Sequence, residues 1–335
     1  MQKMKIDIFT HVLTPKYKEA FSKKATAKSR VFGYVDSFPT LIDLNMRFRI
    51  MDKYEDLMQV LTVTGPPADE VVAPSDAVEL VKIANDEMAE LVAKYPDRFV
   101  SAVACLPLTD MDAALKEIDR TIIELKFRGV EIFTDLRGRP IDSPEFMPLY
   151  EKMAYYDLPI WLHPARDPKI PDYVGENGSK YLVYLIFGYP YQSSVAMTRL
   201  VFSGVFEKYP HLKVITHHCG GIVPYLGERI RVLYDQFEMR QGFEYKPYLT
   251  KSPSDYYRMF YNDTAVCGDT AALICGYQFF GPEHILFGTD MPFDGQIGYR
   301  LVRETIRSVE EMDIPDSEKK KIYEGNARKI MRLPI

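Results

Sequence analysis

Residues 158–163 read Leu-Pro-Ile-Trp-Leu-His, a nearly continuous apolar run that ends in a histidine. A run this short and this apolar is typical of a β-strand that is buried on both faces. Seven further segments read as strands, some of them with the β-branched residues that strands favour. The eight segments are residues 5–11, 57–64, 98–105, 128–133, 158–163, 212–217, 258–263 and 284–290.

Helical patterns separate these segments. The clearest covers residues 112–127, where Leu115, Ile118, Ile122 and Leu125 form one apolar stripe. Strands that alternate with helices pair in parallel through right-handed crossovers. Eight such units in 335 residues predict an α/β protein with a (β/α)8 TIM barrel, as a single domain over residues 1–335. Residues 14–46 lack strand periodicity and are expected to form an insertion after the first strand.

Composition excludes several classes of function. Lysine and arginine number 42 against 47 aspartates and glutamates, with no basic block, which argues against binding to nucleic acid. No apolar run approaches the ~20 residues of a membrane span, and Asp7 interrupts the N-terminal stretch early, so no signal peptide is expected. The four cysteines form no Cys-x-x-Cys pair, which indicates a reducing compartment, the cytoplasm.

The histidines carry the functional information. Of only six, His11, His163 and the pair His217 and His218 end predicted strands, and Asp290 ends the eighth. In a TIM barrel the C-terminal strand ends form the active-site face. Imidazole and carboxylate together suit a divalent metal such as zinc, with manganese or iron as alternatives. Each residue alone could be a hydrogen-bonded structural group or a loop cap, so the hypothesis depends on their coincidence at one rim.

Motifs along nearly the whole chain carry a family resemblance. They are Lys-Ile-Asp-Ile-Phe-Thr-His (5–11), Arg-Ile-Met-Asp (49–52), Cys-Leu-Pro-Leu (105–108), Pro-Ile-Trp-Leu-His-Pro (159–164), residues 203–210, Lys-Val-Ile-Thr-His-His-Cys-Gly-Gly (213–221), Leu-Phe-Gly-Thr-Asp-Met-Pro (286–292) and Gly-Asn-Ala (325–327). In this order they resemble the amidohydrolase superfamily, in the branch of aminocarboxymuconate-semialdehyde decarboxylase and γ-resorcylate decarboxylase.

The resemblance implies a metal site with one departure. The first strand of the family usually reads His-x-His, and both side chains bind the metal. Here the first position is Phe9, which cannot ligate, and the second is His11. The implied ligands are therefore His11, His163 and Asp290, which with a water form an ordinary catalytic site for one Zn²⁺, Mn²⁺ or Fe²⁺. The alternatives are weaker metal binding or none, and Phe9 is then expected to line the substrate pocket.

The sixth strand offers two histidines where the family needs one. Counting back from Gly220, Gly221 and Pro224 places His218 at the catalytic position that the resemblance implies. His217 is then expected to pack between strand and helix. The alternative is that His217 is an extra metal ligand, which would compensate for Phe9.

Candidate substrate contacts follow from position. Arg166 lies on the loop after His163 and is expected to bind a substrate anion, with Arg137 and Arg139 as second choices. Tyr191, with Tyr189, precedes the sixth helix, where aromatic lining would suit a planar acid. The competing interpretations are a solvated loop arginine and ordinary aromatic packing.

The resemblance implies a metal-dependent decarboxylase that acts on a small aromatic or unsaturated carboxylic acid, with Asp290 and His218 transferring protons. A hydrolase or hydratase acting on C–O or C–N bonds could use the same site, with Asp290 as base. A third possibility is a non-catalytic subunit, because Phe9 removes a ligand, although the retention of His11, His163 and His218 argues against it. Family members usually form dimers or larger assemblies, so a homo-oligomer is expected.

Overall fold

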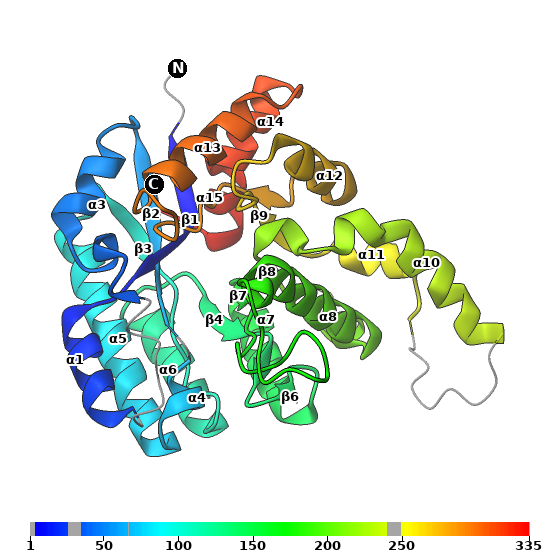
Figure 1. Ribbon diagram of the computed structural model, residues 1–335, viewed down its shortest axis with the longest axis horizontal. Coiled ribbons are helices and arrows are strands. Elements are labelled where there is room, and N and C mark those ends of the chain that lie inside the picture. Colours follow the sequence, from blue (N-terminus) through cyan, green and yellow to red (C-terminus); the bar gives the residue numbers. More distant parts are fainter. Residues whose placement is uncertain (1–3, 26–34, 66, 240–248, 335) are drawn as a thin grey trace.

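The computed structural model describes residues 4–25, 35–65, 67–239 and 249–334 (Figure 1). Every one of the eight predicted segments contains a parallel strand. The strands are β1 (Lys5–Val12), β2 (Leu57–Val63), β3 (Phe99–Ala102), β4 (Val130–Phe133), β7 (Ile160–His163), β8 (Val214–Thr216), β9 (Tyr261–Asp263) and β10 (Ile285–Leu286). A short antiparallel hairpin, β5 (Asp135–Leu136) and β6 (Arg139–Pro140), follows β4.

The eight strands follow one another around a ring. Pairing gives one sheet in the order β1-β2-β3 and a second in the order β10-β9-β8-β7-β4. Backbone hydrogen bonds link the two sheets at both seams. The amide of Ile8 donates to Phe287 (2.9 Å), and the amide of Ala104 donates to Gly129 (3.0 Å). This order and these parallel pairings agree with the predicted TIM barrel.

Helices surround the strands. They are α1 (Pro15–Lys24), α3 (Leu44–Met51), α4 (Ala68–Val71), α5 (Pro74–Lys94), α6 (Met111–Ile123), α7 (Met147–Tyr156), α8 (Tyr189–Phe202), α9 (Val205–Lys208), α10 (Val223–Met239), α11 (Pro253–Tyr257), α12 (Thr270–Phe280), α13 (Tyr299–Glu310), α14 (Asp316–Lys320) and α15 (Asn326–Met331). None of the helices in the described ranges combines the length and apolar character that crossing a bilayer requires.

Helix α6 shows how local sequence sets an element's limits. The Asp110 carboxylate accepts a hydrogen bond from the amide of Ala113 (3.0 Å) and caps the helix at its first turn. Of the predicted apolar stripe, Ile118 is fully buried, and the other three residues are partly buried against the core. The helix ends at Ile123, four residues before the predicted end at 127, because Lys126 adopts a left-handed backbone (φ 59°) that turns the chain into β4.

The segment expected to be an insertion, residues 14–46, is helical in its described part and holds no strand there. It contains α1, a 3-10 turn and the start of α3, and residues 26–34 lie outside the described ranges. Pro15 begins α1, and the carboxylate of Glu87 on α5 accepts from the amides of Lys16 (3.1 Å) and Tyr17 (2.7 Å). This contact fixes α1 beside the barrel, close to the end of β1.

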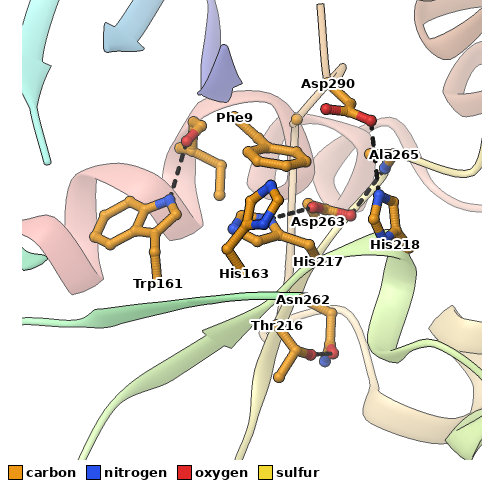
Figure 2. A network of polar contacts seen from close by, with 12 residues as sticks. Phe9, Trp161, His163, Thr216, His217, His218, Asn262, Asp263, Ala265 and Asp290 are labelled. Atoms are coloured by element: carbon orange, nitrogen blue, oxygen red, sulfur yellow. Dashed lines mark hydrogen bonds and ion pairs between the residues drawn. The ribbon is translucent and has the colours of Figure 1, made fainter. Parts of the chain in front are cut away.

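Trp161 fills the barrel interior below the histidines. Its indole Nε1 donates to the carbonyl of Ile8 (3.0 Å), which joins β7 to the non-adjacent β1 across the interior (Figure 2). A Cβ at Gly129 would come within 2.4 Å of the Trp161 ring, so only glycine leaves room for the indole there. With the interior packed at this depth, a substrate can approach only from the C-terminal rim.

Candidate active site

The predicted site residues gather around the ring of Phe9. The Phe9 ring centroid lies 3.6 Å from that of His217, 4.7 Å from His11, 5.7 Å from His163 and 6.2 Å from His218. These residues come from β1, from β7 and from the loop after β8, and Figure 2 shows Phe9 beside the His163 and His217 rings. A phenyl ring therefore stands in the middle of the imidazoles, where the family's first-strand ligand would donate to a metal.

Asp290 connects two of the histidines. Its Oδ1 lies 3.1 Å from Nε2 of His11, and its Oδ2 lies 3.6 Å from Nε2 of His218. Burial alone would raise the pKa of Asp290, but contacts with the two imidazoles hold that pKa well below its usual range. Burial alone would lower the pKa of His218, but Asp290 outweighs burial and raises it. The pair thus favours a carboxylate beside a protonated imidazole.

The backbone at this pair adopts an uncommon conformation. His218 (φ 56°) and Asp290 (φ 62°) both lie in the left-handed region, as does Cys219 after His218 (φ 54°). Each non-glycine residue in this region costs roughly 1–2 kcal/mol, and such residues cluster at functional sites. The left-handed turn after β8 is also what carries the His218 side chain back toward the rim.

His217 lies inside the barrel, so the expected packing between strand and helix is wrong. Its side chain is completely buried, and its Nδ1 donates to Oδ2 of Asp263 (2.8 Å). The physical reason is strand periodicity: Ile215 faces the interior, and a residue two positions later faces the same side. The His217 ring lies 5.4 Å from that of His163.

Asp263, at the end of β9, is a site residue that sequence reasoning missed. Its Oδ1 accepts from the amides of Cys219 (3.1 Å) and Ala265 (2.9 Å), and Oδ2 accepts from His217 (Figure 2). The carboxylate therefore fixes both the His217 ring and the turn after β8. Its place as the last residue of the seventh predicted strand is the sequence feature that could have identified it as a site residue.

The donor chemistry at the rim suits a divalent metal, although the ligands are not preassembled. The His163 Nδ1 donates to the carbonyl of Pro164 (2.8 Å), which leaves Nε2 as the free donor atom. Burial, with the neighbouring His217 and His11, lowers the pKa of His163 well below its usual range, so this imidazole is neutral. The buried Nε2 of His217 has no hydrogen-bond partner in the described residues. Within those residues, no three histidine, cysteine, aspartate or glutamate side chains are already positioned to hold one ion.

Arg166 is the best placed of the three candidate arginines. The Arg166 side chain is partly buried against the helical turn η3 (Tyr184–Gly188). The contact is close, because a Cβ on Gly188 would lie only 2.4 Å from Cδ of Arg166. Arg166 forms no ion pair within the described ranges. Arg137 instead donates to the backbone carbonyls of Asp69 and Val72, and Arg139 pairs with Glu145. Of the three, only Arg166 has a guanidinium without a hydrogen-bond or ion-pair partner among the described residues.

The aromatic residue beside the histidines is Tyr189, not Tyr191. The Tyr189 ring lies 6.2 Å from that of His163 and 6.4 Å from that of His218. Tyr191 is 52% exposed on the first turn of α8. Both residues lie in the first turn of α8, and side chains two positions apart on a helix point about 160° apart, so they cannot face the same surface.

A second residue that the sequence did not reveal is Arg47, on α3. It is completely buried and donates to Oε1 of Gln59 (2.7 Å) and to the carbonyl of His11. Together with the contact of Thr62 Oγ1 with Nδ1 of His11 (3.1 Å), this arginine fixes the end of β1 and the direction of the His11 ring. One arginine in an amphipathic helix gives no sequence signal of such a role.

Comparison with known proteins agrees with this architecture and site. Residues 42–333 match the family model described as amidohydrolase. The γ-resorcylate decarboxylase of Polaromonas sp. is 31% identical over 305 residues, 88% of this chain and 89% of that protein. The 2-amino-3-carboxymuconate-6-semialdehyde decarboxylase of Dictyostelium discoideum is 26% identical, over 98% and 92% of the two chains.

A solved structure extends the comparison to three dimensions. Dihydroxybenzoic acid decarboxylase from Polaromonas sp., with bound manganese and the inhibitor 2-nitroresorcinol, superposes with a TM-score of 0.79 at 26% identity, over 98% of this chain and 97% of that one. The chain described here belongs to the amidohydrolase family. It is an enzyme of that family, in the branch of the aminocarboxymuconate-semialdehyde and γ-resorcylate decarboxylases, as the sequence motifs implied.

Proposed function

We propose that this enzyme is a metal-dependent decarboxylase of a small aromatic carboxylic acid. The observation that carries the proposal is the placement of Asp290 between His11 and His218 at the barrel rim. This arrangement keeps a carboxylate and a protonated imidazole side by side in a largely buried site, which is what delivery of a proton to carbon requires. The related decarboxylases support the same reaction.

In the proposed reaction His218 supplies the proton and Asp290 orients and relays it. The proton adds to the ring carbon that carries the carboxylate. The bond from that carbon to the carboxylate then breaks, carbon dioxide leaves, and the electron pair restores the aromatic ring. His218 regains its proton from solvent. The raised pKa of His218 and the low pKa of Asp290 both favour the starting protonation states at neutral pH.

A single divalent metal at the rim is part of this proposal, with zinc first and manganese or iron as alternatives. His11, His163 and Asp290 would hold it, and the partnerless Nε2 of His217 suits an extra ligand in the place of the donor that Phe9 removes. Asp263 behind His217 is the kind of carboxylate partner that ligating histidines use. When bound, a divalent ion would polarise the substrate's oxygens and neutralise their charge.

Metal content tests the ligand set directly. We expect near one equivalent of metal in the purified protein by plasma mass spectrometry, and its loss in His163→Ala and His217→Ala. His211→Ala, an exposed histidine away from the rim, is the control and should keep the metal. Phe9→His is expected to tighten binding. Absence of metal after reconstitution with zinc, manganese and iron would contradict the metal proposal, and unchanged content in His217→Ala would remove that residue from the set.

Arg166→Gln should weaken substrate binding more than it slows turnover. A hydrogen bond to a charged partner contributes about 1.5–3 kcal/mol, so we expect KM to rise by roughly 10–100-fold. Arg139→Gln, whose partner is Glu145, is the matched control and should leave KM unchanged. Steady-state kinetics on the best acid found below makes the measurement, and an unchanged KM in Arg166→Gln would dismiss this arginine as the carboxylate contact.

A panel of hydroxybenzoic acids, with 2,6-dihydroxybenzoate among them, tests the reaction itself. Carbon dioxide release that depends on Asp290 and His218 is the expected result. Hydrolysis of esters, lactones or amides, or hydration of an unsaturated acid, without carbon dioxide release would favour the alternative chemistry. Inactivity on every class, in protein that carries metal, would favour a non-catalytic subunit.

We also infer a cytoplasmic homo-oligomer that takes a small-molecule carboxylate. All four cysteines are free thiols, which suits a reducing compartment. Helix α10 projects from the body of the molecule (Figure 1), and it exposes Tyr225, Val232 and Met239, an apolar surface of the kind that subunit contacts cover. Sedimentation analysis should give a mass of two or more chains.

A further inference from the structure

A cavity beside the histidines is not used by the reaction described above. Its volume is about 30 Å³, room for a group of the size of a hydroxyl, and it is partly open to solvent. It is lined by residues after β2 and β3, by Tyr17 of α1 and by Glu131 and Phe133 of β4. Phe133 joins this cavity to the rim, because it pairs with His163 in the β4–β7 register and its ring lies 5.4 Å from the His163 ring. The cavity and the rim therefore adjoin at Phe133.

Glu131 is the unusual group in this lining. It sits in the middle of an otherwise apolar strand, paired with Trp161, and is only 4% exposed. Its Oε1 has no hydrogen-bond partner among the described residues. Burial raises its pKa to about 8, so the side chain is a neutral carboxylic acid at pH 7. Buried polar atoms in native proteins almost always have partners, so an unpartnered carboxyl on a residue that lines a cavity indicates a ligand.

The rest of the lining narrows the chemistry of that ligand. Asp69 and Asp135 lie at the same cavity, and burial raises the pKa values of Tyr17 and Cys105, so neither carries a charge at neutral pH. An anionic group would meet carboxylates there and no cation among the lining residues. A neutral carboxylic acid both donates and accepts a hydrogen bond, and its complement is an uncharged group that does the same. A hydroxyl group is the simplest such substituent.

We propose that this cavity receives a ring hydroxyl of the aromatic acid and that Glu131 is the residue that recognises it. The inference rests on the proposed decarboxylase function, which supplies the aromatic acid. It adds a specificity determinant on β4, two residues before Phe133 and on the opposite side of His163 from Asp290 and His218. An acid with a ring hydroxyl at the matching position is then preferred over its deoxy analogue.

Binding measurements test the subsite without turnover. We would titrate the holoenzyme with benzoate and with its 2-, 3- and 4-hydroxy isomers by calorimetry. Wild type should bind at least one isomer about 10-fold more tightly than benzoate, which corresponds to one net hydrogen bond. Glu131→Leu should abolish this ratio while leaving the affinity for benzoate unchanged, and Glu131→Gln, which still donates and accepts, should retain most of it. Glu145→Gln, an exposed glutamate, is the control.

Other outcomes have defined meanings. Equal affinities for benzoate and all three isomers in wild type, or an unchanged ratio in Glu131→Leu, would overturn the subsite. Because binding is measured, a protein that prefers a hydroxy isomer but releases no carbon dioxide would refute the proposed reaction and leave the subsite intact.

The pH dependence of stability tests the protonation state of Glu131 independently of ligand binding. The raised pKa means that folded wild type keeps a proton on Glu131 that the unfolded chain releases above about pH 4.5. Wild type therefore loses stability as the pH rises from about 5 to 8. In Glu131→Gln this contribution is absent, so its urea midpoint should exceed that of wild type by more at pH 8.5 than at pH 5.5. A midpoint difference that is the same at both pH values would mean that Glu131 is not a neutral acid in the folded protein.

Discussion

Asp290→Asn is expected to lower kcat by about 10²–10⁴-fold, the range of general acid–base catalysis, while the chain still folds. The carboxylate holds His11 at 3.1 Å and His218 at 3.6 Å, and it is the reason that the pKa of His218 is raised despite burial. An amide carries no charge, so burial then dominates and His218 loses its proton at neutral pH. The variant lacks both the relay and the protonated donor.

The control for this substitution is Asp167→Asn, on the exposed loop after β7, which should keep full activity. A pH series separates catalysis from folding. The ionised Asp290 contributes stability above the unfolded pKa of about 4, and this stability is lost as the pH falls below that value. The urea midpoints of variant and wild type should therefore differ at pH 7, and the difference should begin to shrink as the pH falls below about 4. A kcat within tenfold of wild type would contradict the assigned role.

The barrel could be predicted because its information is local. Each strand is a short apolar run between turn residues, and a run such as residues 158–163 has few other ways to bury itself. Element ends were less predictable, since they depend on single backbone conformations. Helix α6 stops at Ile123 because Lys126 takes a left-handed conformation, and no hydrophobic period encodes that.

The sequence could predict those rim residues whose place in the site depends only on their position along a strand. His11 and His163 lie at strand ends and Asp290 lies four residues after β10, and fold class is enough to bring these positions together. Predictions that depended on side-chain direction were weaker. His217 faces the interior because it shares the side of Ile215, and Tyr189 rather than Tyr191 approaches the histidines because α8 begins there. The alternation of side chains along β8 would have predicted that His217 faces the interior.

The partners behind the rim were not predictable from one sequence. Arg47 and Asp263 act through hydrogen bonds with residues distant in the chain, and Glu131 is buried without such a bond at its Oε1. Each of the three has an ordinary appearance in the sequence. A charged residue within an apolar strand, as at Glu131, is the one signal that sequence reasoning could have used. Such groups are costly to bury, so their presence in a strand indicates a specific environment.

Asp263→Asn is expected to lower the free energy of unfolding by about 1–3 kcal/mol, because the buried Nδ1 of His217 loses the acceptor of its hydrogen bond. The amide oxygen can still accept from Cys219 and Ala265, but the amide nitrogen then meets Nδ1 of His217, donor against donor. His217 must shift its proton to Nε2, where the described structure offers no acceptor. That tautomer also removes the lone pair that a metal would need, so metal content should fall together with stability.

Asp269→Asn provides the matched control, since Asp269 caps α12 by accepting from the amide of Ala272 (3.1 Å) at the surface and should lose no more than about 1 kcal/mol. A double-mutant cycle with His217→Ala then isolates the pair. If Asp263 acts through His217, the two substitutions should be non-additive by about 1–3 kcal/mol in urea unfolding, and the metal lost in either single variant should not fall further in the double. Additive losses would mean that Asp263 serves only the turn after β8, through Cys219 and Ala265, and that the His217 ring is oriented instead by its stack on Phe9.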